Sequence, residues 1–192
     1  MAQRGLLHPF EWLSPSGQKG AFILFSAMAV GVMVSEIRLD SFLTTDAAPQ
    51  GMISFELAGD SSVARNIVES WWHMGQVYAA LSLGLDYLFL VAYASSIGLG
   101  CVLVARNLPQ PLAIVSCVGT CLAWCQFGAA LLDAMENYAL IQVLLGSGHE
   151  FWPMAARWCA IPKFAIVGAG LAYVALGAVA VVITRTRKAL AA

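Results

Sequence analysis

Long apolar segments alternate with short polar ones along this chain. An apolar run of about 18 residues or more is long enough to cross the hydrocarbon core of a bilayer as an α-helix. Four such segments are present, at about residues 21–38, 77–105, 112–146 and 155–184. We therefore predict an all-α fold, an integral membrane four-helix bundle, in which residues 1–192 form a single four-span domain.

The polar segment 39–76, between the first two spans, contains a helical pattern of its own. Asp60 or Ser61 is suited to cap a helix over residues 62–72. Apolar residues recur in it at helical spacing, which is typical of a helix lying on a membrane surface, although a plain connecting helix has the same pattern. We predict an extracytoplasmic amphipathic helix between spans one and two.

Composition supports lipid as the main partner of the chain. Of the 192 residues, 60% are hydrophobic and 11% are charged, whereas soluble domains carry about 25% charged residues. The net charge of −1 argues against nucleic acid as a partner. No HExxH, GxSxG, P-loop or GxGxxG motif is present, so the chain fits no enzyme class with a readable motif, and catalytic residues stay unassigned.

The distribution of Lys and Arg predicts the orientation, because these residues accumulate in cytoplasmic loops. A cytoplasmic N-terminus would place six basic residues on the cytoplasmic side and three on the other side. The six are Arg4, Lys19, Arg106, Arg185, Arg187 and Lys188, and the three are Arg38, Arg65 and Arg157. We therefore expect both termini to be cytoplasmic.

Ionisable side chains occur inside the second, third and fourth spans. Such residues are costly in lipid and mark functional sites by default. Asp133, Glu136 and Asn137 share one helix face, and at a rise of about 1.5 Å per residue Asp86 and Lys163 lie at similar depths in the outer half of the membrane. The candidate ligand- or ion-binding residues are Asp86, Tyr87, Asp133, Glu136, Asn137 and Lys163.

The charges of this cluster do not balance. Three carboxylates and one ammonium sum to −2 if all are ionised, and desolvation then favours the uptake of a proton or cation. The excess of acid favours a site for a proton, a cation or a small polar ligand, in a carrier-like protein or a membrane enzyme. The alternative is an accessory or structural subunit whose buried charges hold the bundle together, with Lys163 paired to Glu136 or Asp133 in either case. Because four spans are few for a carrier, a homodimer or a larger membrane assembly stays open.

The segment 55–72 is predicted to pack over the outer mouth of the polar cluster as a lid. Aromatic residues such as Trp71 and Trp72 favour the membrane interface. The candidate lid residues are Phe55, Glu56 and Arg65, and we expect Glu56 or Arg65 to reach the cluster.

A metal centre or another cofactor is not expected. Cys117, Cys121 and Cys125 follow one another at helical spacing, but thiols on a single helix without a nearby His form a weak motif, and small residues are common packing surfaces between membrane helices.

Four short motifs carry a resemblance to a known family. They are residues 55–59 (FELAG), 84–89 (GLDYLF), 133–137 (DAMEN) and 163–164 (KF). Together they resemble a functionally uncharacterised family of small bacterial four-span integral membrane proteins. The resemblance covers most of the chain and implies a bacterial inner (plasma) membrane location, and it brings no activity with it.

Overall fold

The computed structural model describes residues 7–108 and 113–190. These ranges contain helices and no strand. The helices are α1 (Pro15–Asp40), α2 (Met52–Glu56), α3 (Ser61–Ser70), α4 (Trp72–Asn107), α5 (Ala113–Leu144) and α6 (Phe151–Leu190). Within these ranges, α1, α4, α5 and α6 are long and apolar enough to cross a membrane. The predicted all-α four-helix bundle is confirmed, and its four apolar helices indicate a multi-pass membrane protein.

The long helices extend beyond the apolar runs that predicted them. The first begins at Pro15 rather than near residue 21, because Ser14 caps it. The Ser14 hydroxyl accepts a hydrogen bond from the Gly17 N–H at 3.1 Å, and proline suits the first helical position because its missing N–H would have no helical partner there. Polar capping residues therefore set this helix end, which a hydropathy pattern does not report.

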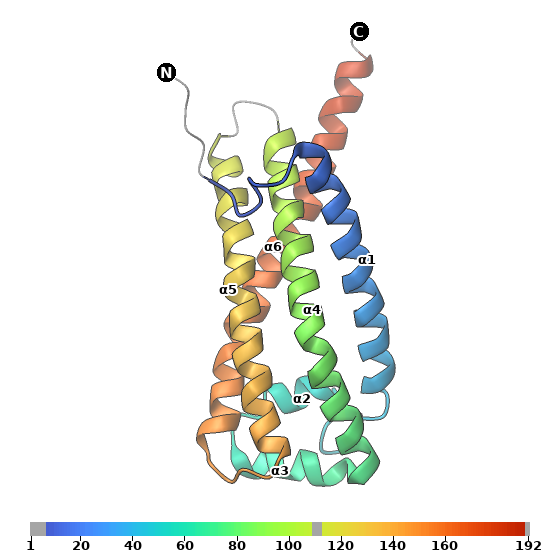
Figure 1. The fold of residues 1–192 in the computed structure, drawn as a ribbon, viewed down its shortest axis with the longest axis vertical. Helices are drawn as coiled ribbons and strands as arrows, with labels where there is room; N and C mark the ends of the chain where they lie inside the picture. The colour runs from blue at the N-terminus through green and yellow to red at the C-terminus, as the bar shows by residue number, and fades with distance from the viewer. Residues whose placement is uncertain (1–6, 109–112, 191–192) are drawn as a thin grey trace.

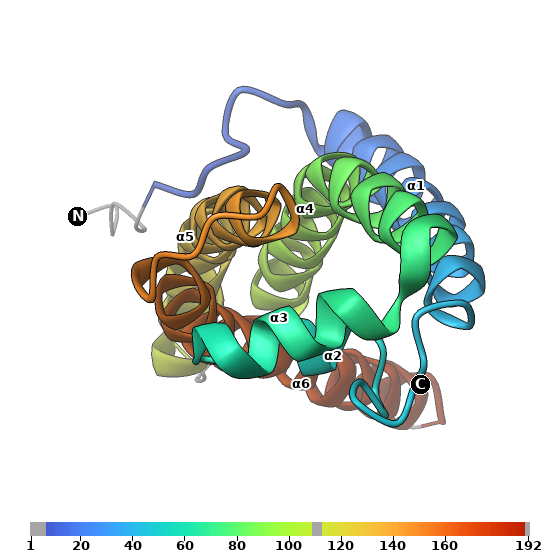
Figure 2. The same ribbon diagram turned by 90° about the horizontal axis from the view of Figure 1, so that it is seen from below.

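The bundle is open along one side. Helix α4 packs against α1, α5 and α6, and α5 packs against α6, whereas α1 and α6 make little or no direct contact. The start of α1 and the end of α6 lie at the same end of the bundle (Figure 1). The opposite end, which we call the capped end, carries α2, α3 and the loop between α5 and α6 (Figures 1 and 2).

Two polar contacts position the short helices at the capped end. Asp40, at the end of α1, accepts a hydrogen bond from the Met52 N–H at 2.7 Å and so satisfies the start of α2. The preceding Gly51 has a φ of 53°, and a Cβ atom there would collide with the Asp40 carboxylate. At α3, the Asp60 side chain accepts hydrogen bonds from the N–H groups of Ser62 and Val63, as expected of a helix cap.

The junction between α3 and α4 is sharp. Trp72, the first residue of α4, has a φ of 51°. This value lies in the left-handed region, which residues other than glycine rarely adopt. The neighbouring Trp71 is buried, and its indole N–H donates to the Leu43 carbonyl at 2.7 Å. One tryptophan therefore anchors the junction, while the other is exposed.

Candidate functional site

Lys163 of α6 is the centre of a buried ion-pair cluster. Its Nζ lies 2.8 Å from a Glu136 carboxylate oxygen and 3.0 Å from an Asp133 carboxylate oxygen. Glu56 of α2 is the third acidic neighbour, at 3.9 Å. The predicted contact of Lys163 with Glu136 or Asp133 is confirmed, and the structure contains both pairs. Lys163 thereby links α2, α5 and α6.

Asp86 joins the cluster through α5. The Asn137 side-chain amide donates to the Asp86 carboxylate at 2.5 Å. Asp133 and Asn137 stand one helical turn apart on the same face of α5. Asp133 contacts Lys163 of α6, and Asn137 contacts Asp86 of α4. Five of the six residues predicted to form the site therefore come together: Asp86, Asp133, Glu136, Asn137 and Lys163.

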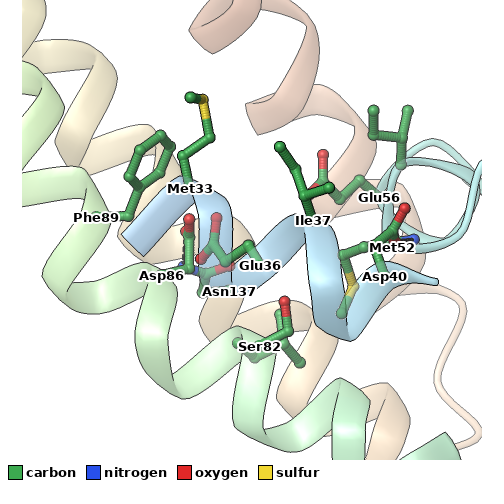
Figure 3. A pocket seen from close by; sticks show the side chains of 12 residues that line it. Met33, Glu36, Ile37, Asp40, Met52, Glu56, Ser82, Asp86, Phe89 and Asn137 are labelled. Carbon is green, nitrogen blue, oxygen red and sulfur yellow. Dashed lines mark hydrogen bonds between the residues drawn. The ribbon is translucent and has the colours of Figure 1, made fainter. Parts of the chain in front are cut away.

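Beside this cluster lies a cavity of about 360 Å³, lined by residues of α1, α2, α4 and α5. Figure 3 shows the side chains of Glu36, Asp86 and Asn137 pointing into it. Glu56 and Asp40 line the same cavity. The acidic character of the site is therefore greater than the sequence prediction assumed.

A second cavity of about 450 Å³ continues from the first and reaches α6. Both cavities share part of their wall, formed by Met33, Glu36, Ile53, Glu56, Asp86 and Phe89. The second one adds Asp133, Lys163 and Tyr93. We refer to the two together as the acidic cavity.

Several polar atoms on the wall of the acidic cavity are buried but lack hydrogen bonds. Within the described ranges, one Glu36 oxygen and the Tyr93 hydroxyl make no hydrogen bond of acceptable geometry. One Glu56 oxygen also lacks a hydrogen bond, and its neighbour is the Lys163 ammonium at 3.9 Å. The Tyr93 side chain is 6% exposed. Buried polar atoms without a partner cost free energy, so a ligand that supplied hydrogen-bond donors there would be stabilised.

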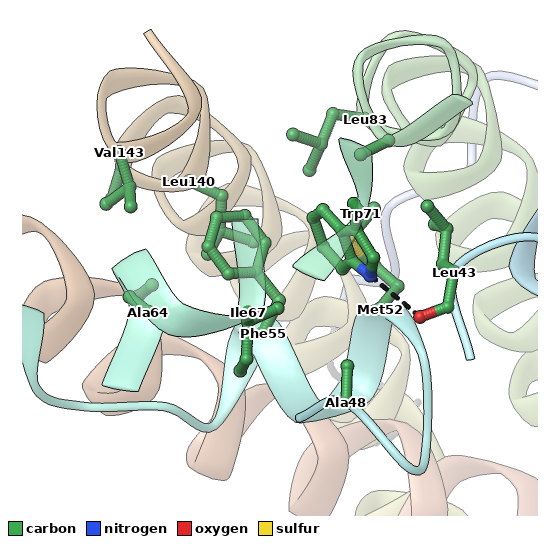
Figure 4. Packing of buried hydrophobic residues seen from close by; sticks show 13 residues of the cluster. Leu43, Ala48, Met52, Phe55, Ala64, Ile67, Trp71, Leu83, Leu140 and Val143 are labelled. Carbon is green, nitrogen blue, oxygen red and sulfur yellow. Dashed lines mark hydrogen bonds between the residues drawn. The ribbon is translucent and has the colours of Figure 1, made fainter. Parts of the chain in front are cut away.

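Helix α2 lies over the cluster, and two of its residues have different roles. Glu56 turns toward Lys163, whereas Phe55 is fully buried in an apolar cluster with Ile67, Trp71 and Leu140. Figure 4 shows this packing, in which α2 and α3 are fastened onto α4 and α5. Phe55 thus anchors α2, and Glu56 is the side chain that reaches the polar site.

The position of Glu56 affects its protonation. Burial raises the pKa of the Glu56 carboxyl above its usual 4.5, and the Lys163 ammonium opposes part of that rise. A carboxyl with a raised pKa contributes stability that is present below about pH 4.5 and is lost as the pH rises through the folded-state pKa. Burial therefore favours the neutral form of Glu56, and the neighbouring Lys163 ammonium favours the charged form.

Besides Phe55, two predicted residues, Tyr87 and Arg65, neither line the acidic cavity nor join the ion-pair cluster. The Tyr87 hydroxyl donates to the Ala134 carbonyl at 3.3 Å, and Tyr87 does not line either part of the cavity. Arg65 is exposed on α3 and faces the loop at Gly148. We expected Glu56 or Arg65 to reach the cluster, and it is Glu56 that does so. Arg65 is exposed because α3 buries Ala64 and Ile67 against the bundle.

The arginines also leave the acid excess uncompensated. In the described part of the chain, the ion pairs of the cluster all involve Lys163. Arg157 instead packs on Gly59, where a Cβ atom would lie 2.7 Å from the Arg157 Cδ. The three carboxylates beside Lys163 are joined on the cavity wall by those of Glu36, Asp40 and Asp86. Six acids therefore share one ammonium, and their net charge is −5 if all are ionised.

Sequence reasoning missed Glu36, which lies near the end of the predicted first span, 21–38, and is not among the candidate site residues. The sequence did contain a pattern that could have identified Glu36, because one face of α1 carries a stripe of residues spaced by about three or four positions. They are Ser26, Ala29, Val30, Met33, Glu36, Ile37 and Asp40, all of which line the acidic cavity. An acid on the same helix face as this stripe points toward the bundle.

The cysteine stripe does not take part in the site. Cys117, Cys121 and Cys125 are exposed on α5. Among the described residues, no group of three or more His, Cys, Asp or Glu side chains is arranged to hold a metal ion.

Comparison with known proteins gives no match for this chain among protein-family models, curated proteins or solved structures.

Proposed function

We propose that this protein binds a proton, a cation or a small polar ligand in its acidic cavity, as a carrier-like protein or a membrane enzyme. The observation that supports this most is the charge imbalance, because three carboxylates lie beside the Lys163 ammonium and three more line the cavity. Like charges at close range in a low-dielectric region repel strongly, and uptake of a proton or cation relieves that repulsion. The Glu36 and Glu56 oxygens that lack hydrogen bonds supply acceptors for such a ligand.

We propose further that the protein lies in a bacterial inner membrane with both termini in the cytoplasm. Support comes from the basic residues at the end of the bundle where α1 begins and α6 ends, which include Lys19, Arg106 and Arg187. The capped end, with α2 and α3, would then face the extracytoplasmic side. A four-span carrier would need a second copy or a larger assembly to enclose a pathway.

A second candidate function is that of an accessory subunit, in which the charges only hold the helices together. It is favoured by one observation, namely that Lys163 contacts acids of α2 and α5 from its place on α6. This candidate predicts that the carboxylates do not respond to added cations.

Infrared spectroscopy of the reconstituted protein separates the two candidates. We expect the C=O stretch of protonated carboxylic acids at neutral pH, and we expect it to weaken when methylammonium is added, because the cation replaces the proton. The double variant Glu36→Gln with Asp86→Asn should lose most of this response. As a control, Asp60→Asn alters an exposed helix cap that does not line the cavity, and it should leave the response unchanged.

A spectrum with no protonated carboxyl and no change on addition of methylammonium would favour the accessory subunit. The same conclusion would follow if the double variant responded as the wild type does.

A further inference from the structure

The acidic cavity is charged at one end and mainly apolar along the rest of its length. Near the capped end its wall carries Glu36, Glu56, Asp86 and Lys163. Farther along, the wall consists mainly of apolar side chains. They are Ala29, Val30, Ile97, Val167 and Leu171.

The α6 side of the wall shows the gradient along a single helix face. Lys163, Val167 and Leu171 are spaced by four residues and all line the cavity. The rise from Lys163 to Leu171 is about 12 Å at about 1.5 Å per residue. A ligand lying along this face would have a polar group at Lys163 and an apolar body that extends away from the capped end.

The cavity also faces the side on which the bundle is open. It takes its wall from both α1 and α6, and these two helices make little or no contact with each other. Val30 on α1 and Leu171 on α6 are 54% and 53% exposed. In a membrane, side chains exposed between two spans border on lipid, so the route into the apolar part of the cavity comes from the bilayer.

The polar end specifies the head group of the ligand. The acid excess selects a positive charge, and the Glu36 and Glu56 oxygens that lack hydrogen bonds call for N–H or O–H donors. A protonated primary or secondary amine meets both requirements, whereas a quaternary ammonium has no hydrogen to donate. The buried Tyr93 hydroxyl, also on this wall, offers a further polar contact.

We propose that the ligand of the acidic cavity is a membrane-dissolved amphiphile with a protonated amine head group and an apolar tail, which enters from the bilayer between α1 and α6. This inference rests on the proposed function, since it names the class of ligand for the same site. With the capped end outside, the ligand lies as an outer-leaflet lipid does, with its head outward and its tail toward the membrane centre. The combined site resembles other ligand pockets in having apolar walls and a few convergent polar groups.

Photo-crosslinking in phosphatidylcholine nanodiscs tests the proposal. The probe is a dodecyl primary amine with a diazirine on its terminal carbon, and labelled residues are located by mass spectrometry. We expect labelling to concentrate on the cavity-lining residues of α1 and α6. The matched probe with a hydroxyl in place of the amine should label this region about tenfold less. The alcohol lacks the charged hydrogen bond to the carboxylates, and the loss of one such bond weakens binding by about this factor.

Two valines on α1 provide a matched pair of variants. Val30 lines the cavity, whereas Val34, which is 44% exposed, does not. Val30→Trp should fill the entrance and reduce amine labelling of the cavity about tenfold, and Val34→Trp should leave it unchanged. Circular dichroism of both variants verifies that each retains its helices.

Competition with unlabelled amines separates failure of this inference from failure of the proposed function. Dodecylamine should compete at an aqueous concentration at least about a hundredfold lower than butylamine, because its longer apolar chain concentrates it in the membrane. If both amines compete equally, the site takes soluble cations, and the lateral entry of an amphiphile is wrong while the proposed function stands.

Two other outcomes would overturn the proposal. Equal labelling of all lipid-facing helix surfaces by the amine and the alcohol would show that no cavity ligand is selected. Labelling of the cavity that persists in Glu36→Gln with Asp86→Asn would show that the acids do not recognise the head group, and both the inference and the proposed function would fail.

Discussion

Lys163 shows how a single side chain can determine the arrangement of its neighbours. A lysine at this depth in a membrane helix needs partners, since an isolated charge there costs at least about 2.5–3.5 kcal/mol even on lenient insertion scales. It has three acidic neighbours, of which Glu136 and Asp133 are within 3.0 Å. Because Glu136 is 0% exposed, water cannot replace Lys163 as its partner.

Removing one member of the buried pair should therefore cost more than removing both. Lys163→Met should lower the free energy of unfolding by about 3–5 kcal/mol, because it leaves buried carboxylates uncompensated. Adding Glu136→Gln should restore part of that loss, with a coupling of about 0.5–3 kcal/mol. Denaturant unfolding in detergent micelles measures Lys163→Met, Glu136→Gln and the double variant. Lys19→Met, which replaces an exposed lysine near the start of α1, is the control. Strictly additive losses would mean that Lys163 and Glu136 do not interact.

At the scale of elements, the capped end depends on a backbone conformation that helix propensity does not predict. The chain turns from α3 into α4 at Trp72, whose φ of 51° is unfavourable for any residue except glycine. The cost of a left-handed conformation is about 1–2 kcal/mol, and the packing of Phe55, Ile67 and Trp71 in the neighbouring apolar cluster offsets it. Tertiary contacts, and not the local sequence, therefore fix where α4 begins.

This conformation predicts a reversal of the usual order of helix formers. Trp72→Gly should be more stable than Trp72→Ala by about 1 kcal/mol, because only glycine adopts a positive φ without strain. Both variants lack the indole ring, so its loss cancels in the comparison. At Val77, an exposed position within α4, the order should be the ordinary one, with alanine more stable than glycine by about 1 kcal/mol. The same order at both positions in denaturant unfolding would contradict the strained junction.

At the scale of the whole molecule, the four spans form an incomplete ring. Helix α4 has neighbours on several sides, while α1 is held mainly by α4. This arrangement exposes an acidic cavity on the side where α1 and α6 are separate. An even number of spans also places the start of α1 and the end of α6 at one end, opposite to α2 and α3.

The positions of the helix ends predict which side of the membrane each loop faces, and reporter fusions can measure this. A fusion after Lys188 should be active only with a reporter that works in the cytoplasm, because both termini are expected there. A fusion at Gly148, in the loop between α5 and α6 at the capped end, should be active only with a reporter that works outside the cytoplasm. If both fusions were active with the same kind of reporter, the four-span arrangement would be wrong. If the fusion after Lys188 worked only outside the cytoplasm and the fusion at Gly148 only inside it, the four spans would stand but the predicted orientation would be wrong.

The sequence by itself determined the four spans, the polar face of α5 and the need of Lys163 for an acidic partner. These follow from hydrophobic length, helical spacing and the cost of charge in lipid, all of which are local properties. The tertiary structure decided which helices are neighbours, and so it brought Glu36 of α1 and Glu56 of α2 beside Asp86 and Lys163. It also turned Arg65 away from the cluster and left α1 apart from α6. Such pairings depend on how helices pack across the bundle, which no spacing within a single segment specifies.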